Sequence, residues 1–209
     1  MITGVVDYKA GNLKSIETAL RHLGADFIVS DIPEKLENCD RLIFPGVGEA
    51  SSAMKNLKES CLDELITGFA AKGNPLLGIC LGCQIILSYS EEGNTACLGL
   101  VDGSVKLFSG FSGLTGDTSA ELLKVPQIGW NTLGFTKKHF LFKGIPDNSS
   151  FYFVHSYYPD VKDEFKIGET EYGITFSSAV ARDNVCAVQF HPEKSGKYGL
   201  MMMDNFLKG

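Results

Sequence analysis

Residues 75–86 read PLLGICLGCQII and place Cys80 between two glycines, where an apolar run gives way to a helical pattern. The run before Cys80 is short and apolar, which is typical of a buried strand. A sharp turn from strand to helix would push the sulfur out of the backbone, and side chains larger than those of Gly78 and Gly82 would collide there. We therefore expect Cys80 at the carboxyl end of a strand, where ligands of parallel sheets collect.

Outward from this turn, strand and helix patterns alternate through the first half of the chain. The expected strands are 2–7, 26–30, 41–48 and 75–80, and the expected helices are 11–24, 50–71 and 81–90. Nearly continuous apolar strands that alternate with helices predict a parallel sheet covered on both faces. The fold class is therefore α/β, with a mostly parallel central sheet flanked by helices.

The second half of the chain contains mainly strand patterns and ends in a helical pattern over 197–207. These strands predict a mixed or antiparallel extension of the sheet. They are expected at 104–108, 127–135, 150–158, 172–183 and 185–193. The segment 109–121 is rich in Gly, Ser and Thr and predicts an exposed loop.

Composition limits the class of protein. The chain has 209 residues, of which 44% are hydrophobic and 21% are charged, and these proportions suit a packed core. A net charge of −6 with scattered basic residues argues against a nucleic-acid-binding face. No signal-peptide pattern opens the chain, and no apolar run approaches the ~18 residues of a membrane span. We expect a cytoplasmic protein with reduced thiols.

Four roles are open for Cys80. As a nucleophile, it would gain from the following helix amino terminus, which favours a thiolate, and from the Leu81 amide, which points toward an oxyanion. As half of a Cys80-x-x-Cys83 redox pair, it would leave the glycines and a later His-Pro-Glu unexplained. A metal site lacks a second Cys or His pair at ligand spacing. The fourth role is a small core residue, which we expect for Cys83.

A nucleophilic thiol needs a base and a group that orients the base. His155 lies in an aromatic strand pattern and is expected in the core. His191 ends the apolar strand of QFHPE, and in an extended chain Glu193 would face the same side and hold the imidazole. Together with Cys80, these residues predict a catalytic triad. Without Cys80, the same pattern would indicate a strand-end histidine beside a surface glutamate.

The stretch PGVG at 45–48 follows another expected strand and lies at the same edge of the sheet. Glycines there let backbone N–H groups approach a ligand closely. The stretch lacks the Lys-Ser/Thr that a phosphate-binding loop needs. We therefore expect PGVG to supply a second oxyanion donor.

The stretches PGVG, GICLGCQ and FHPE occur in the order and approximate separation found in class I glutamine amidotransferases, and the chain resembles that family over about residues 2–207. DYKAGNLKS, KVPQIGWN and YFVHSYYPD are similar to glutaminase subunits of imidazole glycerol phosphate synthases. The resemblance implies a class I glutamine amidotransferase-like (flavodoxin-like) fold. It also implies a single glutaminase domain over 1–209 that needs no metal or organic cofactor.

The resemblance further implies roles for individual residues. Cys80 would be the nucleophile that forms a thioester with L-glutamine, and His191 and Glu193 would complete the triad. The oxyanion and substrate sites would be formed by Gly46, Val47, Gly48, Leu81, Gln84, Ser156 and Tyr157. Ammonia would pass to a cyclase subunit with a (β/α)8 barrel, in a heterodimer that makes imidazole glycerol phosphate and an aminoimidazole carboxamide ribotide in histidine biosynthesis. Trp130 and Tyr152 match aromatic positions near that interface.

Three features depart from the family's pattern. Position 83 is Cys where members commonly have Met or another apolar residue, EASSAM at 49–54 lacks an aromatic, and the segment 109–121 is longer than usual. They leave open a paralogue that feeds a different synthase. Two further hypotheses are a Cys-dependent α/β hydrolase acting on an ester or lactone, and a non-catalytic binding subunit. The hydrolase would usually place its acid well before the histidine.

Overall fold

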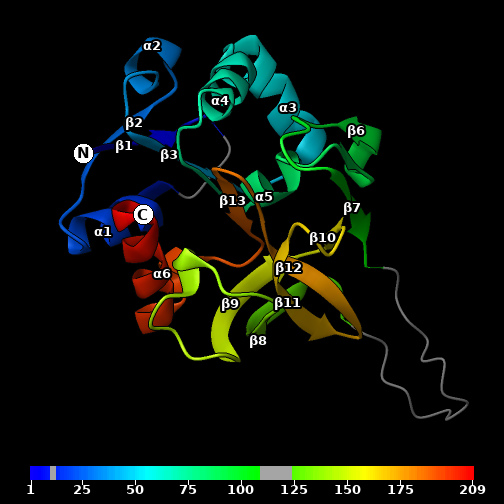
Figure 1. Ribbon diagram of the computed structural model, residues 1–209. Helices are drawn as coiled ribbons and strands as arrows, with labels where there is room; N and C mark the ends of the chain where they lie inside the picture. Colours follow the sequence, from blue (N-terminus) through cyan, green and yellow to red (C-terminus); the bar gives the residue numbers. More distant parts are fainter. Residues whose placement is uncertain (10–12, 109–123) are drawn as a thin grey trace, which may run out of the picture.

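The structure is a computed structural model that describes residues 1–9, 13–108 and 124–209 (Figure 1). Within these residues, nine strands form one central sheet in the order β2-β1-β3-β4-β13-β12-β11-β8-β9. Its parallel strands are β1 (Ile2–Val6), β2 (Asp26–Ser30), β3 (Arg41–Gly46), β4 (Leu76–Cys80) and β13 (Val185–Val188). Every residue of β3 and β4 is buried, which explains why both are apolar runs apart from Arg41 at the start of β3.

The other end of the sheet is antiparallel. Its strands are β12 (Ile174–Arg182), β11 (Lys166–Tyr172), β8 (Gln127–Phe135) and β9 (Ser149–His155). The strand β13 joins the two parts, because it pairs parallel with β4 and antiparallel with β12. The predicted α/β fold, with a mostly parallel sheet and an antiparallel extension, is confirmed.

Helices cover both faces of the parallel strands (Figure 1). Helices α1 (Leu13–His22) and α6 (Gly196–Lys208) lie on one face, and α3 (Ala50–Glu59), α4 (Leu62–Ala71) and α5 (Leu81–Ile85) lie on the other. Alternate residues of a strand face opposite sides, so Phe44 packs with α3, α4 and α5 while Ile43 packs with α1 and α6. A short helix α2 (Pro33–Leu36) precedes β3.

The predicted sheet extension was wrong for two segments, which form a separate four-stranded sheet. This sheet has the order β10-β7-β5-β6, with β5 (Tyr89–Ser90), β6 (Thr95–Ala96), β7 (Gly103–Leu107) and β10 (Tyr157–Val161). The single strand expected at 150–158 therefore breaks at Ser156, between β9 and β10. The Ser156 carbonyl accepts a hydrogen bond from the Phe108 amide at 3.0 Å, which directs the following residues onto β7.

Two predicted helices are shorter than expected. The helix expected over 50–71 divides into α3 and α4 because Cys61 adopts the left-handed conformation, with φ 56°. The helix expected over 81–90 ends at Ile85. The carbonyls of residues 85–87, at its end and just beyond it, accept backbone hydrogen bonds from the segment 98–101. The apolar spacing continues through both breaks, so the sequence pattern did not reveal them.

Two predicted strands also differ. The strand expected over 172–183 is the end of β11 and then β12, because Gly173 turns the chain with φ 69°. The strand expected over 185–193 ends at Val188, and the 3-10 turn η3 (Pro192–Lys194) follows it. Two further 3-10 turns are η1 (Glu92–Asn94) and η2 (Phe140–Phe142).

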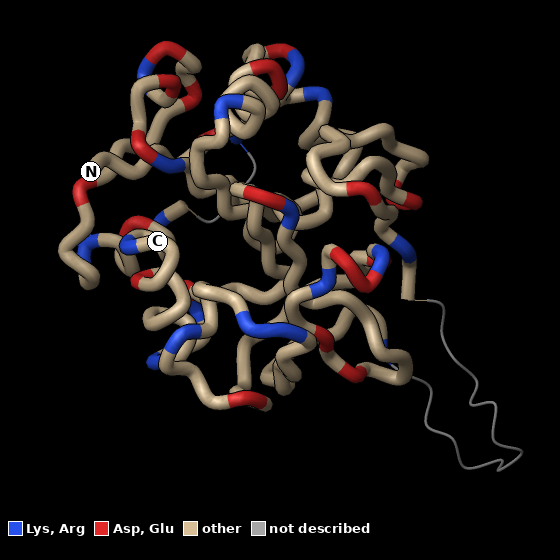
Figure 2. The backbone as a smooth tube through the Cα atoms, viewed as in Figure 1, with Lys and Arg blue, Asp and Glu red and all other residues tan. Residues whose placement is uncertain are grey.

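Charged residues are spread over the outer helices and turns, with acidic and basic positions interspersed (Figure 2). Among the described helices, none has the length and apolar character needed to cross a bilayer. The loop expected at 109–121 lies outside the described residues.

Candidate active site

Cys80 occupies a strained turn between β4 and α5. Its backbone has φ 55° and ψ −109°, in a region where side chains are disfavoured at a cost of about 1–3 kcal/mol. Gly78 and Gly82 allow the turn to close. A Cβ on Gly82 would overlap the Phe44 carbonyl oxygen, and a Cβ on Gly78 would lie 2.9 Å from the Gly82 carbonyl oxygen. The local sequence thus folds into a nucleophile elbow, as the spacing of the glycines predicts.

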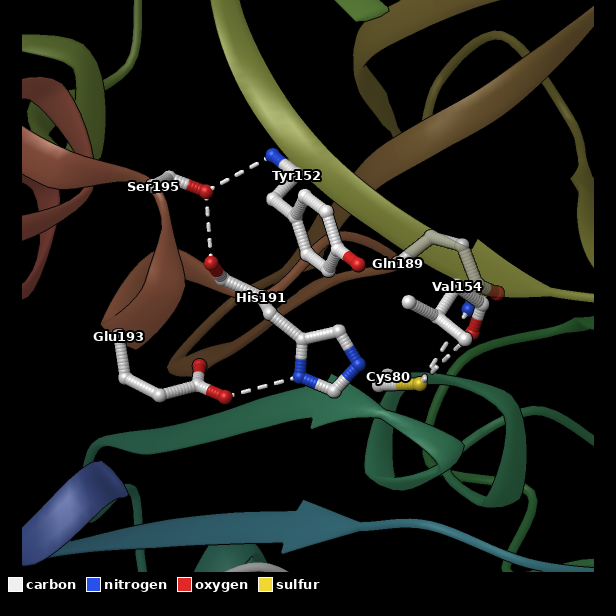
Figure 3. Close-up of polar contacts among 7 residues, drawn as sticks. All are labelled: Cys80, Tyr152, Val154, Gln189, His191, Glu193 and Ser195. Atoms are coloured by element: carbon white, nitrogen blue, oxygen red, sulfur yellow. Dashed lines mark hydrogen bonds and ion pairs between the residues drawn. The ribbon is translucent and has the colours of Figure 1, made fainter. Parts of the chain in front are cut away.

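The sulfur of Cys80 is enclosed, with only 7% of the residue exposed. The Val154 carbonyl oxygen lies 3.9 Å from the sulfur, and Nε2 of Gln189 lies 3.8 Å from it (Figure 3). The His191 ring faces the sulfur from the other side of this small group (Figure 3). A thiol, a ring nitrogen and a buried amide donor therefore converge at the carboxyl end of β4.

The imidazole of His191 is held by Glu193. Its Nδ1 lies 2.8 Å from Oε1 of Glu193, and the two side chains are 6% and 3% exposed. Burial alone would lower the pKa of His191, but hydrogen bonds and charge at Cys80 and Glu193 raise it to about 10. This rise favours the protonated ring, and a cationic ring beside a thiol favours the thiolate.

The backbone at His191 is fixed by hydrogen bonds from two other segments. Its amide donates to the Tyr152 carbonyl oxygen at 2.9 Å, and Ser195 Oγ donates to its carbonyl oxygen at 2.6 Å. The Tyr152 amide in turn donates to Ser195 Oγ at 2.9 Å (Figure 3). Glu193 reaches His191 from the turn η3, whereas the sequence predicted an extended strand through both residues.

A cavity of about 320 Å³ opens beside Cys80 and His191. It is lined by residues from both sheets and from the loops at the carboxyl edge of the parallel strands. The lining residues are Val47, Gly48, Cys80, Leu81, Gln84, Glu92, Pro126, Val154, His155, Ser156, Tyr157, His191 and Lys194. A space of this size suits a small ligand such as an amino acid.

The chain matches the family model of class-I glutamine amidotransferases over residues 4–209. The chain belongs to the class-I glutamine amidotransferase family. Within this family, it is 44% identical to imidazole glycerol phosphate synthase subunit HisH of Maridesulfovibrio salexigens over 202 residues, which cover 97% of this chain and 94% of that protein. It is 45% identical to the HisH subunit of Bacteroides fragilis, with full coverage of both chains. These matches place it among the HisH glutaminase subunits.

Solved structures of glutamine amidotransferases share the fold. A crystal structure described as glutamine amidotransferase superposes with a TM-score of 0.71 at 20% identity, covering 100% of this chain and 98% of that one. The PurLQS structure from Thermotoga maritima gives a TM-score of 0.71 at 17% identity, covering 99% of this chain and 97% of that one. At these identities the likeness concerns the fold alone.

Most residues that the family resemblance assigned to the oxyanion and substrate sites lie on the cavity. Val47, Gly48, Leu81 and Gln84 line it from the parallel strands' edge, and 156–157 line it between β9 and β10. Gly48 has φ 102° and open space beside its Cα, so its backbone can approach a ligand.

Gly46 does not line the cavity, in contrast to the prediction. It pairs with Cys80 in the β3–β4 ladder, and the Tyr8 hydroxyl occupies the space that a Gly46 side chain would need. The Gly46 backbone therefore supports the elbow through the pairing of β3 with β4.

Five residues of the site were missed by the sequence analysis: Glu92, Lys194, Pro126, Val154 and Gln189. Glu92 lines the cavity and accepts a hydrogen bond from the Ala50 amide at 2.8 Å, and burial is the main cause that raises its pKa. No local pattern marks Glu92, since only the fold brings it to the site. Gln189 stands two positions before His191, so the alternation of an extended chain was a signal that could have found it.

Of the remaining candidates, His155 lines the cavity, whereas Trp130, Tyr152 and Cys83 lie outside it. Trp130 and Tyr152 face each other across β8 and β9 with ring centroids 6.0 Å apart, and Trp130 is 59% exposed. Cys83 is fully buried, and burial raises its pKa well above the usual range. His155 is buried as expected, and burial lowers its pKa to about 4. Among the described residues, no group of three or more His, Cys, Asp and Glu could hold a metal ion.

Proposed function

We propose that this chain hydrolyses L-glutamine to glutamate and ammonia, with Cys80 as the nucleophile, His191 as the acid and base, and Glu193 as the group that orients His191. One observation carries the proposal. The elbow thiol of Cys80 faces an imidazole held by Glu193 at 2.8 Å, beside a cavity of about 320 Å³. The family to which the chain belongs consists of glutamine amidotransferases, which supports this chemistry.

The first step joins the sulfur of Cys80 to the side-chain amide carbon of glutamine. The carbonyl π electrons move onto oxygen, and backbone N–H groups of Leu81 and of Val47 or Gly48 donate hydrogen bonds to this oxyanion. Each such donor is worth about 10²–10³ in rate. The positive φ of Cys80 supports this geometry, because it turns the sulfur toward the start of α5.

His191 then transfers its proton to the amide nitrogen, the carbon–nitrogen bond breaks, and ammonia leaves a glutamyl thioester on Cys80. The now neutral imidazole takes a proton from water, whose oxygen attacks the thioester carbon. The carbon–sulfur bond breaks, glutamate departs, and the imidazolium is restored. Glu193 orients the imidazole throughout and stabilises the cationic ring. These steps use no metal or organic cofactor.

The cavity offers groups of both charges for the zwitterionic end of glutamine. The carboxylate of Glu92 suits the α-ammonium group, and the ammonium of Lys194 suits the α-carboxylate. The polar groups of Gln84, Ser156 and Tyr157 fix the remainder of the substrate, together with the backbone of Gly48. A neutral ester or lactone would leave the two charged residues unpaired, which favours glutamine over the hydrolase hypothesis.

The ammonia would be delivered to a partner subunit. The identity to HisH subunits supports a heterodimer of the single glutaminase domain 1–209 with a cyclase subunit of (β/α)8 architecture, making imidazole glycerol phosphate and an aminoimidazole carboxamide ribotide in histidine biosynthesis. Trp130 and Tyr152 are large aromatic groups at the surface and suit docking anchors. Water would protonate free ammonia, so the two active sites must be connected.

The experiment measures glutamate production by the lone chain, by the chain with the cyclase subunit, and by both with the cyclase's ribotide ligand. We expect low activity alone and an increase of hundreds-fold in the complete mixture. One additional oxyanion donor, worth about 3–4 kcal/mol, suffices for that increase. The PGVG glycines would permit the peptide rotation that supplies it.

The matched variant is Cys80→Ala, for which we expect a loss of at least about 10³-fold in every mixture. Substantial glutamine-dependent turnover in this variant would refute the nucleophile. Equal turnover in all three wild-type mixtures would refute activation by the partner. Activation by a different synthase alone would preserve the mechanism and reassign the pathway.

A further inference from the structure

Gln189 is a fully buried carboxamide between the proposed nucleophile and the proposed substrate site. It follows β13 directly and has no exposed surface. Its Oε1 lies 2.9 Å from Nε2 of Gln84, and its Nε2 lies 3.8 Å from the sulfur of Cys80. The mechanism above uses neither group of this side chain, so its conformation calls for a physical reason.

The orientation of the Gln189 carboxamide is set by a chain of hydrogen bonds that begins at a backbone carbonyl. The Tyr157 carbonyl oxygen accepts from Nε2 of Gln84 at 3.1 Å. A carbonyl only accepts, so the Gln84 carboxamide must turn its NH₂ group toward Tyr157. That same NH₂ group faces Gln189, which must therefore present its oxygen to Gln84 and its own NH₂ group to the sulfur of Cys80.

The backbone prevents Gln189 from leaving this arrangement. Its amide donates to the Ser178 carbonyl oxygen at 2.9 Å, which continues the pairing of β13 with β12 for one residue. The next residue, Phe190, is also fully buried and packs on Phe151 with ring centroids 4.3 Å apart. Because the backbone is anchored at Gln189 and at the next residue, the buried side-chain carboxamide of Gln189 cannot turn toward water. Its NH₂ group therefore remains directed at the sulfur of Cys80.

We propose that Gln189 is a positioning residue that stabilises the ionised sulfur of Cys80 by donating an N–H hydrogen bond, and that it links this sulfur to the substrate-binding Gln84. The inference rests on the proposed function. An ionised sulfur accepts hydrogen bonds far better than a thiol, so a fixed donor favours ionisation and holds the sulfur in one place. Together with His191, the sulfur then has one cationic and one neutral donor.

The test compares wild type with Gln189→Met, which keeps the length of the side chain and removes its N–H and its oxygen. Inactivation of the lone chain by iodoacetamide is measured from acidic to alkaline pH without glutamine. We expect the pH of half-maximal inactivation to rise by about one unit and inactivation at pH values below the wild-type midpoint to slow by about tenfold, as for loss of a hydrogen bond to a charged group. Glutamine hydrolysis should lose kcat while KM changes less than twofold.

A second variant reverses the electrostatic effect. Gln189→Glu places a carboxylate opposite the sulfur, so the half-maximal pH should rise further than in Gln189→Met. The control is Ser178→Ala, which removes a buried hydroxyl hydrogen-bonded to Thr170 at 2.7 Å without touching Cys80. Its inactivation profile should equal that of wild type. An unshifted profile in folded Gln189→Met overturns the inference.

A measurement on the wild-type chain covers the case in which both variants fail to fold. The side-chain NH₂ resonances of Gln189, followed by ¹⁵N NMR, should shift with the same pH midpoint as inactivation and should lose that shift after alkylation. Resonances that ignore the state of the sulfur overturn the inference. A turnover-competent Cys80→Ala variant would instead refute the proposed function, so the two failures are distinguishable.

Discussion

The parallel half of the sheet (β2, β1, β3 and β4) and its antiparallel half (β12, β11, β8 and β9) contribute different parts of the site. The parallel half contributes fixed backbone, because its buried strands end in tight turns at 46–48 and at Cys80. The antiparallel half lines the cavity and fixes the backbone of the catalytic histidine. Val154 lines the cavity, and the Tyr152 carbonyl oxygen accepts a hydrogen bond from the His191 amide. Its alternating strand β9 faces both the core and the surface.

This difference teaches how each half tolerates change. Where the backbone forms the elbow, at Gly78 and Gly82, no side chain can be added without moving a carbonyl. Where side chains form the site, their protonation states and volumes determine which substitutions are tolerated. Gln189 and His191 follow directly after the joining strand β13, so the reacting groups meet where the two halves meet.

The largest expected effect is that of Gly82→Ala in the parallel half. The new methyl group would overlap the Phe44 carbonyl oxygen, so the elbow or β3 must shift, at an expected cost above about 3 kcal/mol in the free energy of unfolding. Chemical denaturation measures this loss. The matched control is Gly68→Ala in α4, where the Cβ meets no atom within 4 Å, and a gain of up to about 1 kcal/mol is expected. Equal stabilities for the two variants would show that the main-chain contact at Gly82 does not restrict the residue at that position.

The second effect belongs to the antiparallel half and depends on pH. Burial lowers the pKa of His155 to about 4 from 6.5. The unfolded chain therefore takes up a proton before the folded chain does, and stability falls as the pH falls from about 6.5 to about 4. By pH 5 this contribution should be smaller by about 2 kcal/mol. Unfolding free energies at pH 7, 6 and 5 measure it.

His155→Gln is the comparison for this prediction. Its stability should depend less on pH in the same window, while carboxylates contribute equally to both proteins. The pKa of His191 is raised to about 10, so its effect on the pH dependence of stability has the opposite sign in wild type and in the variant alike. Its contribution to stability is present below pH 6.5 and is lost as the pH rises through about 10. Identical acid slopes for wild type and His155→Gln would contradict the prediction.

The smallest effect is expected for Cys83→Ala, one turn beyond the elbow. Cys83 is a residue of α5 whose side chain is buried in the core, so loss of its sulfur should cost about 1 kcal/mol of stability. Under reducing conditions, glutaminase activity should stay within twofold of wild type, because burial raises the pKa of Cys83 well above its usual range and keeps it a thiol. A loss of glutaminase activity comparable to that of Cys80→Ala would revive the redox hypothesis. It would also show that the parallel half contributes a second reactive side chain to the site.

The sequence predicted the parallel half well because burial and turn geometry there leave few choices of residue. Gly78 and Gly82 are dictated by main-chain contacts within a few ångströms, so the elbow is visible as a spacing. The left-handed Cys61 was invisible because the apolar pattern continues through it. In the antiparallel half, the break at Ser156 depends on a hydrogen bond from Phe108, which is distant in the chain.

The site shows the same division. Cys80, His191 and Glu193 stand in short motifs that keep their spacing, whereas Glu92 reaches the cavity only through the fold. Side chains that converge from separate elements leave no joint pattern in the sequence. The catalytic residues could therefore be predicted from the chain, and the charged lining of the cavity could not.

The pairing of β13 with β4 has a consequence for how the protein is made. Gln189 is 109 positions from Cys80, so at a synthesis rate of about 5–20 residues per second the ribosome adds it roughly 5–20 s after the cysteine. During that interval the nascent chain holds a thiol with no base beside it. The subunit becomes able to release ammonia only when β13 docks beside β4, so unfinished chains do not hydrolyse glutamine.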